Sequence, residues 1–196
     1  NSKFLLISLR ILNNSLFWKI INFLLMVYIV FMTIIVKDKN TLLFKDFQFR
    51  CCVGKNKFSK KKTEGDKKTP IGIFNIGSLY YRADRFKEPL TKLKTYKIKK
   101  NMGWCNDVTH KKYNKLIKIT KKKINHEKLF RRDYKYDFFI PIKYNFNKVV
   151  PNKGSAIFIH LTKNYQTTAG CIALSKKDFL ILIKLIDKNT KIKILR

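Results

Sequence analysis

The sequence predicts a mainly β fold of the α+β class, and three observations support it. Short segments in which apolar and polar residues alternate recur along the chain, separated by turns rich in Gly, Asn and Lys. Only one amphipathic helical pattern stands out, near the C-terminus. The chain of 196 residues is 45% hydrophobic and 14% aromatic, which is enough apolar material for a buried core.

The formal net charge of +32 points first to a polyanion such as nucleic acid. Lys far outnumbers Arg, and Ile, Asn and Phe are abundant, as in the product of an AT-rich coding sequence. Phe and Tyr follow strand alternation rather than clustering with basic residues, so we expect no nucleic-acid partner. A basic polyanion-binding domain remains an alternative. Four cysteines without C-x-x-C spacing indicate neither a disulfide scaffold nor a zinc site.

The first 31 residues form a hydrophobic segment that we separate from a domain at 32–196. Residues 16–36 are almost entirely apolar and reach the roughly 20 residues that a membrane-spanning helix needs. Two features oppose a span: three lysines follow the segment, and residues 33–36 and 41–44 read as strands joined by a polar turn. The segment is either an anchor or signal-like segment that associates with the inner membrane, or a dispensable extension.

The remaining strands are predicted from the same alternation. A basic loop at 55–69 and a polar, aromatic, loop-rich middle insertion at 80–135 interrupt them, and the runs of Lys at 60–62 and 121–123 read as solvated loops. The predicted strands lie at 47–51, 70–76, 136–144 and 155–161.

A helix–strand unit ends the domain. Ser175 followed by Asp178 resembles a capping box, with a hydroxyl for an early backbone N–H and a carboxylate at the positive end of the helix dipole. The pattern predicts a helix that ends near Lys188, followed by a strand at 191–195. Its buried stripe, spaced i, i+3, i+4, i+7, is Phe179, Leu182, Ile183 and Ile186.

One pair of residues could carry chemistry. Strand alternation places Ala156, Phe158 and His160 on one face, with His160 at the end of the strand. Gly170 permits a tight backbone immediately before Cys171. Only a thiolate attacks, so a nucleophilic Cys needs a base nearby, which His160 can supply. From residue types alone, a small core Cys and a solvated His remain the alternative.

Two separated motifs resemble the L,D-transpeptidase catalytic domain family (YkuD/ErfK type). Residues 154–161, Gly-Ser-Ala-Ile-Phe-Ile-His-Leu, and 168–174, Thr-Ala-Gly-Cys-Ile-Ala-Leu, are similar to its strand His followed by Ser/Thr-His-Gly-Cys. Residues 65–74 are similar to its Thr-Pro-x-Gly-x-Phe strand. The likeness covers about residues 33–195 and implies an L,D-transpeptidase-like β-sandwich.

The chain departs from the family pattern at three points. Ala169 replaces a second His, Ala173 replaces an Arg or Asn, and the interval from His to Cys is shorter. We interpret these as features of a subfamily with TAGCIAL in place of SHGC, in which the His160/Cys171 pair is kept.

The resemblance implies a cysteine transpeptidase acting on peptidoglycan stem tetrapeptides. A thioester forms as the terminal D-amino acid leaves, and transfer to another stem gives a 3-3 cross-link; transfer to water, as in an L,D-carboxypeptidase or hydrolase, is the alternative. By this resemblance Cys171 is the nucleophile and His160 the general base. The Gly170 backbone serves the oxyanion hole, the Leu161 carbonyl orients the base, and Thr168 supports the loop.

Substrate, location and assembly follow from the same resemblance. No metal or organic cofactor is expected, and the protein is expected to be a monomer in the periplasm or cell envelope. The middle insertion is expected to shape the substrate groove through Trp104, Asp107, Tyr113 and Asn114.

Overall fold

The computed structural model describes residues 16–24, 32–120 and 124–196. Residues 16–24 are helical, and the folded domain carries the helix α2 (Lys176–Leu185). Its strands are β1 (Thr33–Val36), β2 (Thr41–Phe44), β3 (Phe47–Cys52), β4 (Phe58–Ser59), β5 (Thr69–Pro70), β6 (Gly72–Asn75), β7 (Leu79–Tyr81), β8 (Thr95–Lys97), β9 (Met102–Cys105), β10 (Leu116–Lys118), β11 (His126–Lys128), β12 (Phe138–Pro141), β13 (Phe158–Leu161), β14 (Ile172–Leu174) and β15 (Lys191–Ile194).

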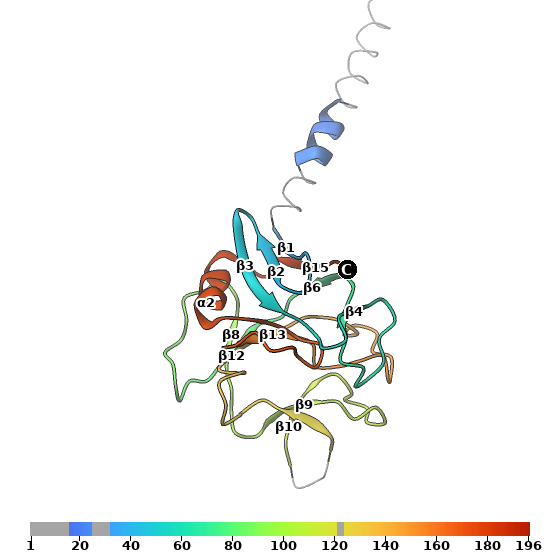
Figure 1. Ribbon diagram of the computed structural model, residues 1–196, viewed down its shortest axis with the longest axis vertical. Helices are drawn as coiled ribbons and strands as arrows, with labels where there is room; N and C mark the ends of the chain where they lie inside the picture. The colour runs from blue at the N-terminus through green and yellow to red at the C-terminus, as the bar shows by residue number, and fades with distance from the viewer. Residues whose placement is uncertain (1–15, 25–31, 121–123) are drawn as a thin grey trace, which may run out of the picture.

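Ten of these strands form one curled sheet, in the order β6-β15-β1-β2-β3-β14-β13-β12-β7-β8 (Figure 1). Most neighbours are antiparallel, but three pairs run parallel: β13 with β14, β1 with β15, and β7 with β8. The predicted mainly β fold with a C-terminal helix–strand unit is confirmed. The parallel pair matters most for function, because β13 carries His160 and β14 begins directly after Cys171.

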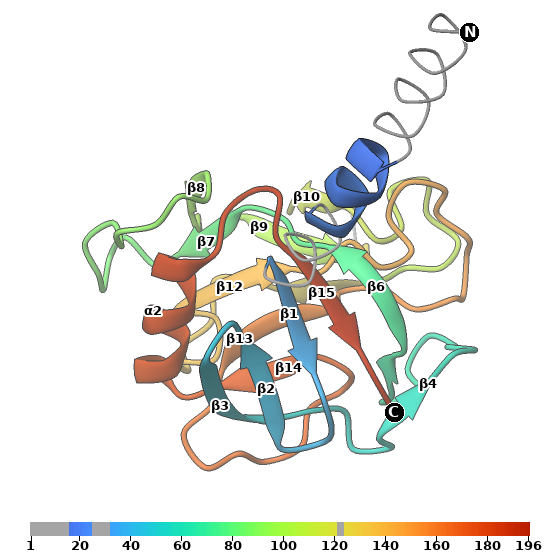
Figure 2. The same cartoon turned by 90° about the horizontal axis from the view of Figure 1, so that it is seen from above.

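The helix α2 covers one face of this sheet beside β13 (Figure 2). All four residues of its predicted stripe are fully buried and belong to the main hydrophobic cluster, together with Ile157, Ile159 and Leu161. The Ser175 side chain accepts a hydrogen bond from the N–H of Asp178 at 3.1 Å, as the capping pattern predicts. The helix ends at Leu185, earlier than predicted, because Ile186 is already extended (φ −92°, ψ 159°).

The opposite face of β13 supports a second hydrophobic cluster. Trp104, Tyr136, Phe139 and Phe158 belong to it, and so does Cys171. A three-stranded sheet in the order β10-β9-β11 lies over this cluster. The sequence predicted only loops in this middle insertion, because its strands are three or four residues long and show no clear alternation.

Local patterns placed six of the other strands, whereas β4, β7, β8 and β14 were not predicted. The hairpin of β1 and β2 has its predicted bounds, and β3, β12, β13 and β15 lie at the predicted segments with shifted ends. The strand expected at 70–76 is split: β5 pairs with β4, and β6 pairs with β15 at the edge of the large sheet.

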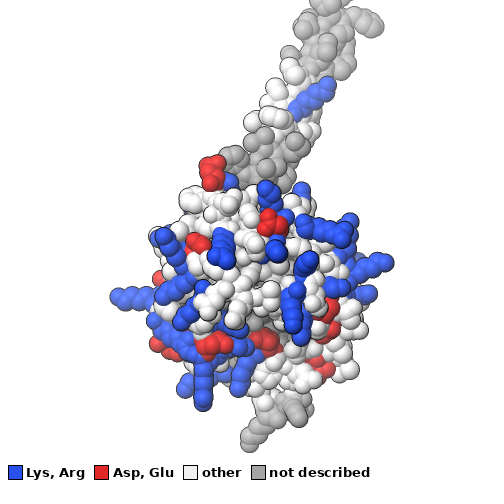
Figure 3. Space-filling view, viewed as in Figure 1, with Lys and Arg blue, Asp and Glu red and all other residues white. Residues whose placement is uncertain are grey.

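The apolar segment at 16–36 is described only in part, since residues 25–31 lie outside the described residues. Six large apolar side chains between 16 and 24 are exposed. Within 16–24, 32–120 and 124–196, no helix is both long enough and apolar enough to cross a membrane. Basic side chains are spread over the surface in view rather than gathered in one stripe (Figure 3).

Candidate active site

The register of β13 and β14 brings the predicted pair of functional residues together. His160 lies opposite Ala173 in the parallel ladder. Cys171 is two residues before Ala173, so its side chain lies on the same face of the sheet as His160 and Phe158. His160 and Cys171 line one cavity, and both are nearly buried, with 6% and 7% of their surface exposed.

The Cys171 sulfur is held by backbone groups at the start of β13. It accepts a hydrogen bond from the N–H of Phe158 at 3.3 Å and donates one to the carbonyl of Ala156 at 3.3 Å. Ala156 has a left-handed backbone (φ 52°), an uncommon conformation for a residue with a side chain. Of the hydrogen bonds among the described residues, none joins this sulfur to the His160 ring. The sulfur is thus held by the backbone, in the same cavity as the imidazole.

The His160 ring is oriented by a backbone carbonyl. Its Nδ1 lies 2.9 Å from the carbonyl oxygen of Leu161, as the family resemblance implied. Only a protonated Nδ1 can donate to that oxygen, so the neutral ring keeps Nε2 as its basic nitrogen. The Tyr136 ring packs edge-on against the imidazole, with 5.4 Å between centroids and 77° between planes. Both contacts fix the ring in the cavity wall.

Burial sets the charge state of both groups. Burial raises the pKa of the Cys171 thiol to about 12, although the hydrogen bond from Phe158 opposes this shift. Burial also lowers the pKa of His160 to about 4, against the opposing effect of the bond to Leu161. At neutral pH the site therefore holds a neutral thiol and a neutral imidazole, and the base is free to accept a proton.

The loop before Cys171 is fastened to the first part of the chain. The Thr168 hydroxyl donates to the carbonyl of Cys171 at 2.6 Å and accepts from the N–H of Gly170 at 3.1 Å. The Thr168 backbone also bonds to Val53 and Lys55, at 2.9 Å in each case. This geometry agrees with the predicted loop-supporting position of Thr168.

Gly170 is fixed by the predicted Thr-Pro element. The buried Thr69 hydroxyl donates to the Gly170 carbonyl and accepts from the N–H of Gly54, both at 2.9 Å. Gly170 has φ 133°, and a Cβ there would lie 2.8 Å from the carbonyl oxygen of Lys68. The Gly170 N–H, predicted to serve an oxyanion, donates here to the Thr168 hydroxyl, and its predicted role stays a prediction.

Two cavities meet at Cys171, and Glu127, Tyr136 and Ala169 border both of them. The first, of about 250 Å³, also contains His160 and the basic residues Arg131 and Lys135. The second, of about 240 Å³, lies on the side of the basic loop and the start of β13. Its other lining residues are Lys62, Glu64, Gly65, Lys67, Asn106, Gly154, Ser155, Ala156 and Ile157.

Two buried polar atoms in the second cavity have no hydrogen-bond partner among the described residues. They are Asn106 Oδ1 and Ser155 Oγ. Buried polar atoms are rarely left unpaired in folded proteins, so a water or a bound molecule can complete their hydrogen bonds.

The family model of the L,D-transpeptidase catalytic domain matches residues 30–194. The chain belongs to this family. The recognition from sequence motifs is thereby confirmed. A search of curated proteins found no match.

The L,D-transpeptidase domain contains a buried lysine that the sequence did not predict. Lys62, within the run expected to be a solvated loop, is 4% exposed. Its ammonium pairs with the Asp66 carboxylate and donates to the Lys68 carbonyl at 2.6 Å. Burial by itself would raise the pKa of the Asp66 carboxyl. Hydrogen bonds from the Lys62 ammonium and from two backbone N–H groups outweigh burial, so this pKa is lowered. The second run of lysines expected to be a solvated loop, at 121–123, lies outside the described residues.

The four residues expected to bind substrate do not line either cavity at Cys171. Asn114 instead connects three segments: it accepts from Trp104 Nε1 at 2.9 Å and from the N–H of Ala156 at 3.1 Å, and donates to the carbonyl of Tyr144 at 3.0 Å. The Tyr113 hydroxyl bonds to Glu64, which does line the second cavity. Asp107 accepts from Thr109. Trp104 lines a separate cavity of about 280 Å³, and the role of these four residues in substrate binding stays a prediction.

The cysteines are all free and buried. The described residues contain no group of three or more His, Cys, Asp or Glu side chains that could hold a metal ion.

Proposed function

We propose that this L,D-transpeptidase domain acts on peptidoglycan stem tetrapeptides through a thioester on Cys171. The observation that carries the proposal is that Cys171 and His160 line one cavity, with the ring oriented by Leu161 at 2.9 Å. A nucleophile beside a base whose other nitrogen is held by a third group is the arrangement that acyl transfer requires.

In the first half-reaction the Cys171 sulfur attacks the carbonyl carbon before the terminal D-residue, and its proton passes to Nε2 of His160. The sulfur must first turn away from the carbonyl of Ala156, to which the resting thiol donates. The carbon–nitrogen bond then breaks, and the imidazolium returns the proton to the departing amine. A thioester on Cys171 remains. With the Gly170 N–H engaged by Thr168, the N–H of Cys171 is the candidate donor for the oxyanion.

In the second half-reaction an amine of another stem attacks the thioester, and the sulfur leaves with a proton. The second cavity offers a place for this amine, because Asn106 Oδ1 has no hydrogen-bond partner among the described residues and can accept one from it. The product is a 3-3 cross-link, and the site of action is the periplasm or cell envelope, where peptidoglycan lies.

The test is to incubate the full chain with disaccharide-tetrapeptide and to weigh both products and protein. We expect release of one D-amino acid, a dimeric product, and an acyl adduct on the protein that Cys171→Ala abolishes. Cys105→Ala, which removes another buried thiol outside both cavities, is the matched control. An unchanged substrate under reducing conditions contradicts the proposal.

A second variant tests the acceptor. Asn106→Leu is expected to lower dimer formation while the D-amino acid is still released, so that hydrolysis takes a larger share. Release without any dimer in the unmodified protein would instead identify a hydrolase.

A further inference from the structure

Asn114 lies in the loop between β9 and β10, and its side chain is buried. Only 3% of its surface is exposed, and its backbone is left-handed (φ 56°). Among the described residues its side-chain amide makes four hydrogen bonds, which satisfy both of its polar groups. Oδ1 accepts from Trp104 Nε1 at 2.9 Å and from the N–H of Ala156 at 3.1 Å. Nδ2 donates to the carbonyls of Tyr144 at 3.0 Å and Asn145 at 2.7 Å.

These four bonds leave a single orientation for the Asn114 amide. Turning the amide over would place its NH₂ group against two donors, the Trp104 indole and the N–H of Ala156, and its oxygen against two carbonyls. Asn is also one of the residues that adopt a left-handed backbone most readily. The side chain and the backbone of Asn114 therefore agree in holding the amide oxygen toward Ala156.

The bond to Ala156 matters because of the backbone conformation at that residue. Ala156 is left-handed (φ 52°), which costs a residue with a Cβ about as much free energy as one hydrogen bond contributes. In this conformation its carbonyl accepts from the Cys171 sulfur, and the N–H of Phe158 donates to the same sulfur, both at 3.3 Å. Relaxation of Ala156 to a common conformation would turn its carbonyl away. A hydrogen bond on the N–H of Ala156 opposes that relaxation.

A second route connects the Asn114 amide with the sulfur. Its other donor, Trp104, packs edge-on against Phe158, with 5.2 Å between ring centroids and 80° between planes. The N–H of Phe158 is the group that donates to the Cys171 sulfur. Asn114 therefore braces both residues that hold the sulfur, Ala156 by a direct bond and Phe158 through the Trp104 ring.

We propose that Asn114 is a positioning residue that holds Ala156 in its left-handed conformation and thereby aims the Cys171 thiol. Asn114 lines neither cavity at Cys171, so its effect passes through Ala156. When the thiol proton passes to His160, the N–H of Phe158 stabilises the thiolate, provided that the start of β13 keeps its place. The proposal rests on the proposed function, because it takes Cys171 to be the nucleophile of that reaction.

The first measurement is the infrared S–H stretching band of Cys171 in the full chain. It is obtained as the difference between each protein and the same protein with Cys171→Ala. A thiol that donates a hydrogen bond absorbs at a lower frequency than a free thiol. Asn114→Gly removes the amide but keeps a residue that adopts φ 56° without strain, and we expect its band to move to higher frequency as the Ala156 carbonyl turns away. An unmoved band overturns the proposal.

Two variants separate positioning from a general loss of structure. Asn114→Asp keeps an oxygen for the N–H of Ala156, and its carboxyl, buried against two carbonyls, is expected to be protonated; the band should stay where it is in the unmodified protein. Ile183→Val trims a fully buried side chain of α2 and should lower stability in urea without moving the band. A band that moves as far in Ile183→Val as in Asn114→Gly overturns the proposal.

Turnover of disaccharide-tetrapeptide shows whether the position of the thiol matters for the reaction. Asn114→Gly is expected to lower kcat about tenfold with little change in KM, because a misplaced nucleophile slows the chemical step rather than binding. Asn114→Asp should restore most of kcat. A loss confined to KM would instead indicate substrate binding by Asn114 and overturn the proposal. If the unmodified protein releases no D-amino acid, the proposed function fails, while the infrared bands still decide whether Asn114 positions the thiol.

Ala156→Gly tests the intermediary. Glycine adopts the left-handed conformation freely, so in a protein that carries Ala156→Gly the Asn114 amide has less strain to oppose. Adding Asn114→Gly to this protein should therefore lower kcat, and move the S–H band, by less than it does in the unmodified protein. Effects of the two substitutions that combine independently would show that Asn114 does not act through Ala156, and would overturn the proposal.

Discussion

Burial of His160 makes folding stability depend on pH, and the size of the effect can be worked out. Its pKa is about 4 in the folded protein, against an ordinary value of 6.5. Between these values the unfolded chain binds the proton more tightly, so stability is full above pH 6.5, falls between pH 6.5 and pH 4, and levels off below pH 4. The linkage relation gives a loss of about 2 kcal/mol between pH 7.5 and pH 5, and about 3 kcal/mol at pH 4.

The assay is urea unfolding, followed by tryptophan fluorescence, at pH 7.5 and pH 5 for the unmodified protein and His160→Gln. Carboxylates with lowered pKa, such as Asp66 and Asp133, lose stabilising charge in acid in both proteins, so they cancel in the difference. We expect the stability gap between the two proteins to shrink by about 2 kcal/mol on going to pH 5. His110→Gln controls for the loss of a histidine as such. A gap that changes by less than about 0.5 kcal/mol would mean that the imidazole is solvated, and the neutral pair of thiol and imidazole would be refuted.

Three further substitutions test the framework of the site. Gly170→Ala places a Cβ 2.8 Å from the Lys68 carbonyl oxygen and should lower kcat/KM at least about a hundredfold in a release assay; retained activity would show that the loop adapts. Thr69→Val removes the hydroxyl that joins Gly54 to Gly170 and should cost about 2–3 kcal/mol of unfolding free energy in urea, an effect that exposed Thr109→Val should not reproduce. Ser175→Ala removes the N-cap of α2 and should cost about 1 kcal/mol in the same assay, whereas an unchanged midpoint would show that the cap contributes nothing.

Local patterns predicted the elements whose partners lie nearby or whose faces alternate cleanly. The hairpin of β1 and β2, the stripe of α2 and the two faces of β13 all follow from periodicity that a single segment displays. His160 could be singled out because it lies at the end of a predicted strand, and Cys171 because it follows a glycine that permits a tight turn. Their placement in one cavity depends on the parallel pairing of β13 with β14, which periodicity alone does not specify.

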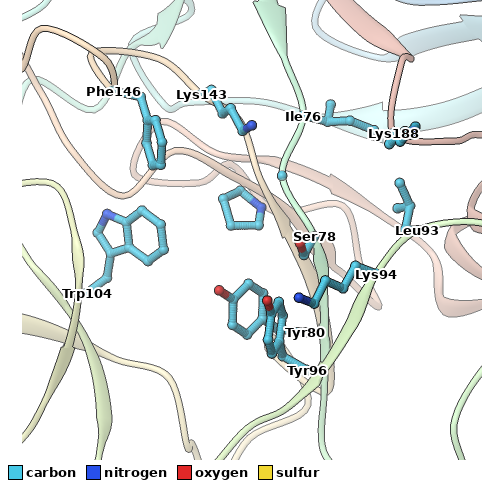
Figure 4. Close-up of a pocket in the computed structure, with 12 residues that line it drawn as sticks. Ile76, Ser78, Tyr80, Leu93, Lys94, Tyr96, Trp104, Lys143, Phe146 and Lys188 are labelled. Atoms are coloured by element: carbon cyan, nitrogen blue, oxygen red, sulfur yellow. The ribbon is translucent and has the colours of Figure 1, made fainter.

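Features built from distant segments escaped prediction for a physical reason. Asn114 bonds to groups near residues 104, 144 and 156, so nothing in its own neighbourhood marks it as a connector. Lys62 is buried because Asp66 and the Lys68 carbonyl satisfy its ammonium, a result that a run of three lysines conceals. One cavity of about 280 Å³ is lined by four aromatic rings and three lysines that come from five separate segments (Figure 4), which explains why the sequence showed no aromatic–basic cluster.

The position of β15 has a consequence for how the protein is made. This strand enters the large sheet between β1 and β6, two elements synthesised much earlier, and pairs with both. Until residues 191–194 leave the ribosome, β1 and β6 lack the neighbour that joins them. The sheet that carries the catalytic pair therefore closes late, through contacts between segments far apart in sequence, which is the kind of step that makes folding slow.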